Sequence, residues 1–177
     1  DQLRNQYNER LNRASENVLE TMEDLLLWSK SQMNNFTPQN KTIKIAPLLM
    51  QEKEFFEEQI KEKNLRLNVN VSLEISQNTD ENFIAVILRN LIQNAIKQCD
   101  GKATITITAD SNTISITNPS PNKNAAELNL ILQQTLVNSK YSGLGLQIVK
   151  DLATRLGLKI FYKQEDDQNI SAVLSWG

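Results

Sequence analysis

The chain has 177 residues, which is room for one ordinary domain and an appendage, and its 40% hydrophobic and 23% charged residues are the balance of a soluble globular protein. One cysteine, Cys99, excludes an intramolecular disulfide framework and fits a reducing compartment, and the absence of histidine excludes a histidine general base or metal ligand within this chain. The net charge of −2 argues against nucleic-acid binding, and without a run of 18 apolar residues we expect no membrane contact by this fragment.

Residues 2–34 are predicted to form one long α-helix. Apolar or small residues recur in steps of three, four or seven at Tyr7, Leu11, Ala14, Val18, Leu25 and Trp28, and a second stripe follows Leu19, Met22 and Leu26. So wide an apolar surface calls for a partner helix. At about 1.5 Å per residue the helix would extend about 45–50 Å and overhang a small domain, although packing on its own domain is the alternative. The polar run that continues to Asn40 and contains Pro38 predicts a linker.

Strands and helices are predicted to mix along residues 41–177. A short strand over 42–45 precedes a helix over 47–63 with Pro47 in its first turn, and alternation over 65–73 indicates a half-buried strand. Asp80 is placed to cap a helix over 81–99. The remaining predicted elements are a hairpin of strands 103–109 and 113–117 stopped by 118–121, helices over 125–137 and 143–156, and a final hairpin of strands 158–162 and 170–175. Hairpins mixed with helices predict an α+β two-layer sandwich, with helices on one face of a mixed sheet.

Three polar residues of the predicted helix 81–99 lie on one face. Asn90, Asn94 and Lys97 are spaced i, i+4 and i+7, opposite a row of apolar residues. Asparagine is a mediocre helix former, so two on one face suggest a purpose. Amide oxygens suit a hard cation such as Mg²⁺, and an ammonium suits a phosphate. Spacing alone equally allows two solvent-facing asparagines and a surface lysine.

Two glycines introduce the next amphipathic helix, in the stretch Ser142-Gly143-Leu144-Gly145-Leu146-Gln147. Glycines at a helix start let backbone N–H groups approach a phosphate, and the helix dipole favours its negative charge. They are also ordinary turn residues. A Rossmann site is disfavoured because no strand leads directly into this turn and no third glycine follows as expected, and no Walker phosphate loop is present.

The combination of these stretches resembles the sensor histidine kinases. Asp80-Glu81-Asn82-Phe83 followed by Asn90-Leu91-Ile92-Gln93-Asn94-Ala95-Ile96-Lys97 is similar to their N box, and the stretch from Ser142 to Lys150 is similar to their second glycine box. Residues 25–32 resemble the end of their second dimerisation helix. The family belongs to the GHKL ATPase superfamily, which also contains gyrase, a heat-shock chaperone and a mismatch-repair protein. The resemblance covers nearly the whole chain with its motifs in the expected order.

The resemblance implies a fold, ligands and partners. Residues 1–40 would be the C-terminal helix of the dimerisation region plus a linker, and residues 41–177 an ATP-binding catalytic domain of the Bergerat type. ATP and Mg²⁺ would be the cofactors, with Asn94 and nearby Asn90 holding the metal. Lys97 would contact the phosphates, and the turn Gly143-Leu144-Gly145 would present backbone amides to them. A homodimer through the N-terminal helix, a response-regulator receiver domain as partner and a cytoplasmic location are also implied, whether or not the parent protein has a membrane anchor.

Two motifs depart from the family pattern. The first glycine box usually supplies an aspartate for the adenine amino group, and here the corresponding stretch ends in Asn118-Pro119-Ser120, which keeps an acceptor oxygen but not the charge. The phenylalanine box of the lid expected between Asn118 and Gly143 is not recognisable. The phosphoacceptor histidine would lie upstream of Asp1 or be missing from the parent.

This combination of intact and altered motifs is compatible with two main functions. The first is an enzyme module that transfers the γ-phosphoryl group of ATP to a histidine outside this chain, for relay to a response-regulator aspartate. The alternative is a degenerate kinase domain that serves as a dimerisation or interaction module with weak or no nucleotide binding. The two intact motifs favour the first, Asn118 favours the second, and an ATPase of another branch of the superfamily is a third possibility.

Overall fold

The computed structural model describes residues 7, 11, 15, 18, 19, 22, 25–30, 32, 33, 37–133 and 144–177. The chain divides into two compact units, Asp1–Thr37 and Pro38–Gly177. In the first unit, the described residues from Tyr7 to Lys30 are helical, as the apolar stripes predicted, and Gln32 and Met33 form a turn. The expected helix therefore ends a few residues before 34, and its other residues lie outside the described ones.

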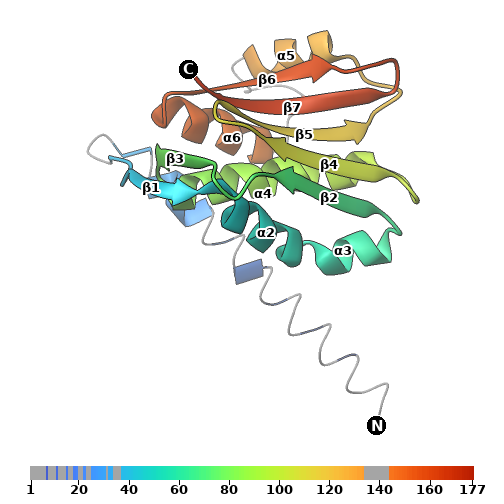
Figure 1. Ribbon diagram of the computed structural model, residues 1–177, viewed down its shortest axis with the longest axis horizontal. Helices are drawn as coiled ribbons and strands as arrows, with labels where there is room; N and C mark the ends of the chain where they lie inside the picture. The colour runs from blue at the N-terminus through green and yellow to red at the C-terminus, as the bar shows by residue number, and fades with distance from the viewer. Residues whose placement is uncertain are drawn as a thin grey trace. The chain divides into compact units, whose positions relative to one another are not determined.

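The second unit is built on a mixed five-stranded sheet. Figure 1 shows its strands in the order β2-β4-β5-β7-β6. The β2–β4 pair is parallel and the other three pairs are antiparallel. The bounds are β2 Arg66–Val71, β4 Thr104–Ala109, β5 Thr113–Pro119, β6 Leu158–Gln164 and β7 Asn169–Trp176.

Helices form the second layer, and the expected α+β architecture is confirmed. Their bounds are α2 Ile45–Phe55, α3 Glu57–Glu62, α4 Glu81–Gln98, α5 Ala125–Gln133 and α6 Leu144–Arg155. The central strands β4 and β5 alternate buried isoleucines with less buried threonines and serine, so their apolar row faces the helices. Helix α4 supplies much of the core with side chains that are fully buried: Phe83, Ile84, Ile87, Leu88 and Ile92. Truncating such a residue to alanine costs about 2–5 kcal/mol.

A second, two-stranded sheet was not predicted. Strand β1, Lys41–Lys44, pairs antiparallel with β3, Ser76–Thr79. The β3 sequence is Ser-Gln-Asn-Thr, so no apolar alternation marks it as a strand, and it exists because β1 provides backbone partners. The expected strand over 42–45 is thereby shifted one residue toward the N-terminus, and Ile45 begins helix α2.

Several predicted boundaries were wrong. The single helix over 47–63 is two helices, because Phe56 leaves helical geometry (φ −91°, ψ 2°), is buried, and stands edge-on to Phe55. The strand predicted to reach Leu73 ends at Val71, and Leu73 is 70% exposed. Strand β5 continues through Pro119, which pairs with Asn169 at the end of the ladder, where a missing N–H is tolerated.

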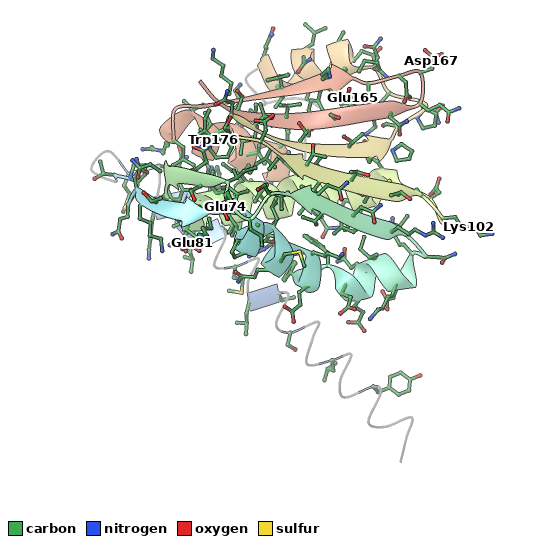
Figure 2. The ribbon with its side chains drawn as sticks, viewed as in Figure 1. Glu74, Glu81, Lys102, Glu165, Asp167 and Trp176 are labelled. Atoms are coloured by element: carbon green, nitrogen blue, oxygen red, sulfur yellow. The ribbon has the colours of Figure 1, made fainter. Side chains whose placement is uncertain are left out.

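Local capping follows the expected chemistry. The Asp80 carboxylate accepts the N–H groups of Asn82 (3.0 Å) and Phe83 (3.3 Å), which stabilises α4 by about 1 kcal/mol. Gly157 ends α6 with a positive φ of 69°, as a glycine in that position allows. Figure 2 shows Asp167 in the β6–β7 turn, at the same end of the sheet as Lys102 just before β4. This end of the sheet also holds Asn118 and the C-terminus of α4.

Candidate nucleotide-binding site

The polar face of α4 opens into a cavity of about 510 Å³, within the range of small-ligand sites. Asn90, Asn94 and Lys97 all line it, as their spacing on one helix face required. The further described residues of its lining are Gln93, Gln98, Lys123, Leu128, Ile131, Leu144, Gly145, Leu146 and Tyr162. From Asn90 to Gln98 the cavity follows α4 for about 12 Å, at about 1.5 Å per residue.

Asn90 connects α4 to the start of α6. Its Nδ2 donates to the Val86 carbonyl at 2.8 Å, which orients the amide. Its Oδ1 faces Gly145 so closely that a Cβ on that residue would lie 2.5 Å from the oxygen. Glycine is therefore required at 145 for this approach, and an amide oxygen lies beside the first turn of α6. Leu144 also lines the cavity, whereas Gly143 lies outside the described residues.

Asn94 and Lys97 continue this polar surface. Asn94 is half-buried and Lys97 is exposed, and within 37–133 and 144–177 neither side chain makes a hydrogen bond or an ion pair. Within the described residues, both side chains are thus available to bind a ligand. Gln93, which directly precedes Asn94, donates from Nε2 to Gln59 Oε1 of α3 at 3.2 Å and so helps to hold α4 in place.

Helix α4 is further fixed by charged contacts on its other sides. The Arg89 guanidinium binds the buried Glu52 carboxylate at 3.3 Å and lies 4.8 Å from the Phe55 ring centroid. Lys63 donates from Nζ to the Ile96 carbonyl at 2.9 Å, near the helix C-terminus where a cation is favoured. These contacts come from α2 and from the residue after α3. They hold the helix that carries Asn90 and Asn94.

Asn118 is not among the described residues that line the cavity. It is 7% exposed, and its Nδ2 donates to the Pro119 carbonyl at 2.9 Å. It lies next to Cys99. Burial is the largest influence on the Cys99 thiol and raises its pKa, whereas a hydrogen bond from the Asn118 side chain acts in the opposite direction. The structure thus places Asn118 beside the cavity end of α4, with its amide hydrogen-bonded to the protein.

Ser120 organises that same end of the site. Its Oγ donates to Gln98 Oε1 at 3.1 Å, and its N–H donates to the Gln168 carbonyl in the β6–β7 turn. Its carbonyl accepts the Lys123 N–H at 3.1 Å, which closes a turn that brings Lys123 to the cavity. Sequence reasoning did not identify Lys123 or Gln98. A basic residue in the proline-flanked stretch after Asn118 was the available signal for Lys123.

The lining has a charge pattern suited to a polyphosphate. Its described members include two lysines and no acidic residue. Among residues 37–133 and 144–177, no cluster of three histidine, cysteine, aspartate or glutamate side chains could hold a metal. A hard cation would be bound through the amide oxygens of Asn90 and Asn94 and through oxygens of the ligand itself, which is how Mg²⁺ is commonly held beside phosphates. The donor set therefore fits Mg²⁺ with a nucleotide.

The chain matches one known family of ATPases. Residues 79–176 match the family described as histidine kinase-, DNA gyrase B-, and HSP90-like ATPase. The chain belongs to this ATPase family. The matched segment runs from the end of β3 to the end of β7, and every described residue that lines the cavity falls within it. The family predicted from the N box and the second glycine box is thus confirmed.

Solved structures of histidine kinases share the fold of this ATPase domain. The cytoplasmic segment of histidine kinase QseC matches with a TM-score of 0.65 and 15% identity, over 92% of this chain and 93% of that one. The catalytic domain of histidine kinase ThkA matches at 0.67 and 21% identity, over 77% and 94%. The Acinetobacter baumannii histidine kinase AdeS matches at 0.63 and 19% identity, over 94% and 82%. A search of curated proteins finds no significant match. In the described part of this family member, no helix is both long and apolar enough to cross a membrane.

Proposed function

We propose that the chain is the ATP-binding catalytic part of a two-component sensor histidine kinase. It would transfer the γ-phosphoryl group of ATP to a histidine outside the chain, for relay to a response regulator. The observation that carries the proposal is the pairing of Asn90 Oδ1 with the glycine start of α6, in a cavity lined by two lysines and no described carboxylate. Family membership and the shared fold of histidine kinases support it.

The proposed roles follow from the chemistry of each position. Asn94 and Asn90 would hold Mg²⁺ through their amide oxygens, and the bound metal would neutralise charge on the phosphates. Lys97 would contact the same phosphates, and Lys123 would add a second cation to this surface. Backbone N–H groups of Gly143, Leu144 and Gly145 would meet the phosphates at the positive end of α6. Asn118 would accept the adenine amino hydrogen.

The transfer itself needs few protein groups. The acceptor histidine attacks the γ-phosphorus, the bond to the β,γ-bridging oxygen breaks, and ADP leaves with that electron pair. The chain's residues would position the phosphates and stabilise their charge, which is the main contribution of proteins to phosphoryl transfer. A cytoplasmic location accompanies this role, and the matched segment of QseC is described as cytoplasmic.

Residues 1–40 are proposed as the last helix of the dimerisation region with its linker, and residues 41–177 as the catalytic domain. The described residues of the first unit support a partner, because seven apolar side chains there are more than half exposed: Tyr7, Leu11, Val18, Leu19, Met22, Leu26 and Met33. A second copy of the chain would cover them in a helical bundle. Sedimentation tests this: identical monomeric behaviour of the full chain and a 41–177 fragment would contradict it.

Binding and transfer assays test the kinase proposal. Calorimetric titration should detect ATP binding that requires Mg²⁺. With γ-labelled ATP, the isolated chain should acquire no acid-labile label, because it contains no histidine, whereas a supplied dimerisation fragment with its histidine should be labelled slowly. Acid-labile label on the chain itself, or no Mg²⁺-dependent binding, would contradict the assignment.

One observation favours a degenerate module as the second candidate. The Asn118 amide is uncharged and its Nδ2 is bonded to Pro119, so adenine binding would lack the stronger hydrogen bond to an ionised acceptor. A chain that dimerises but binds no nucleotide would support this reading.

A further inference from the structure

The Asn129 side chain of helix α5 forms two hydrogen bonds to the backbone of strand β6. Asn129 Nδ2 donates to the Tyr162 carbonyl at 2.7 Å, and the Tyr162 N–H donates to Asn129 Oδ1 at 2.7 Å. Among the described strands, β6 lies at the edge of the sheet and pairs with β7 alone. The Asn129 amide therefore makes the pair of hydrogen bonds that a further antiparallel strand would make to Tyr162. Figure 1 shows α5 alongside β6.

A second contact keeps the start of α5 at the same strand. The Ala125 N–H donates to Gln164 Oε1 at 3.2 Å, and Gln164 is two residues beyond Tyr162 in β6. Gln164 in turn donates from Nε2 to the Asp166 carbonyl at 2.7 Å, within the β6–β7 turn. The first turn of α5 and the residue at its centre are thus both bonded to β6.

The residues beside this contact form the apolar side of the cavity. Leu128 and Ile131 of α5 line it, as does Tyr162 itself, whereas α4 contributes the amides and Lys97 on the polar side. Tyr162 is 9% exposed, and burial raises the pKa of its phenol to about 12, so the ring is neutral at physiological pH. A triphosphate gains nothing from this apolar surface, but a flat heterocyclic base does.

We propose that Asn129 is a positioning residue for the base of the nucleotide. By pairing with the Tyr162 backbone it holds Leu128, Ile131 and Tyr162 in the places where they contact the heterocycle. This inference rests on the proposed nucleotide-binding function and adds a residue that the family motifs do not include. Asn129 does not touch the ligand in this arrangement, because its amide is used by the strand.

The test separates the base from the phosphates. Asn129→Ala is compared with wild type and with Gln133→Ala, an exposed residue at the end of the same helix, by titrating Mg·ATP and Mg·tripolyphosphate. Asn129→Ala should weaken ATP binding about tenfold. This is the effect of losing one to two hydrogen bonds that hold Leu128, Ile131 and Tyr162 in place. Tripolyphosphate affinity should stay within about twofold, and Gln133→Ala should match wild type for both ligands.

A third variant and an exchange measurement keep the result specific. Asn129→Asp retains the acceptor for the Tyr162 N–H but faces the Tyr162 carbonyl without a donor, so it should weaken ATP binding as the alanine does. Hydrogen exchange at the Tyr162 amide should be slow in wild type and faster in Asn129→Ala. Equal exchange rates, unchanged ATP affinity, or parallel loss of ATP and tripolyphosphate would overturn the inference. A wild-type chain that binds neither ligand would contradict the proposed function and this inference together, whereas wild-type binding that Asn129→Ala fully retains contradicts the inference alone.

Discussion

The cavity has two ends that are assembled in different ways. At one end, Asn90 and Asn94 lie one helical turn apart on α4, and Gly145 approaches Asn90 from the start of α6. At the other end, Gln98 meets Ser120 from the turn after β5, and Asn118 is buried next to Cys99. The first end depends on helical period and one close contact. The second depends on where several separate segments of the chain meet.

The largest effect is expected from Asn94→Ala at the first end. The variant should lose Mg²⁺-dependent ATP affinity by about a hundredfold, because a metal ligand is removed, while its stability should stay within about 0.5 kcal/mol. Asn82→Ala, an exposed asparagine on the same helix, is the matched control and should bind as wild type. Calorimetry with and without Mg²⁺ measures this. Equal affinity in Asn94→Ala would place the metal elsewhere.

Gly145→Ala should weaken Mg·ATP binding by about tenfold. The added Cβ would lie 2.5 Å from Asn90 Oδ1 and would force that amide away from its place. Overpacking of this kind also costs about 1–3 kcal/mol of stability. Denaturant unfolding of the two single variants and the double variant with Asn90→Ala forms a cycle. The penalty of Gly145→Ala should largely vanish in the Asn90→Ala background, and an unchanged penalty would mean that the two residues are not coupled.

Asn118→Asp probes the second end and should have a smaller effect on binding. If Asn118 accepts the adenine amino group, ATP affinity should rise by at most about tenfold and GTP affinity should not change. Stability should fall by about 1–3 kcal/mol, because a carboxylate cannot donate to the Pro119 carbonyl as the amide does. Titration with both nucleotides decides the matter. Equal, weak affinity for ATP and GTP in both proteins would exclude an adenine site here and favour the degenerate module.

Tyr162→Phe should change ATP affinity by no more than about twofold near neutral pH, because the ring is kept and the phenol is neutral there. Its effect should emerge in alkali. Burial raises the folded-state pKa to about 12, above the usual 10, so the unfolded chain ionises first and stability falls as pH rises from about 10 to about 12. The full loss is about 3 kcal/mol at about 1.4 kcal/mol per pKa unit. Guanidinium unfolding at pH 8 and pH 11 should show a smaller alkaline loss in Tyr162→Phe, and an equal loss would contradict burial of the phenol.

The features that rest on local rules could be predicted from the sequence alone. The 3.6-residue period places Asn90, Asn94 and Lys97 on one face of α4, and the Asp80 cap and the alternating strands of the hairpins depend only on neighbours in the chain. These rules were sufficient for the α+β fold and for the polar side of the cavity.

The remaining features depend on contacts between segments that are far apart in the chain, so no local pattern in the sequence predicts them. Strand β3 has no pattern of its own and forms because β1 is there to pair with it, and the helix breaks at Phe56 because that ring is buried in the core. Lys123 reaches the cavity through a turn made by Ser120, and Asn129 contacts Tyr162 across 33 residues of chain. Packing likewise decides whether an asparagine side chain faces a ligand or a neighbouring carbonyl, because the same amide can make either hydrogen bond. Asn118 is an example, since its Nδ2 donates to the Pro119 carbonyl.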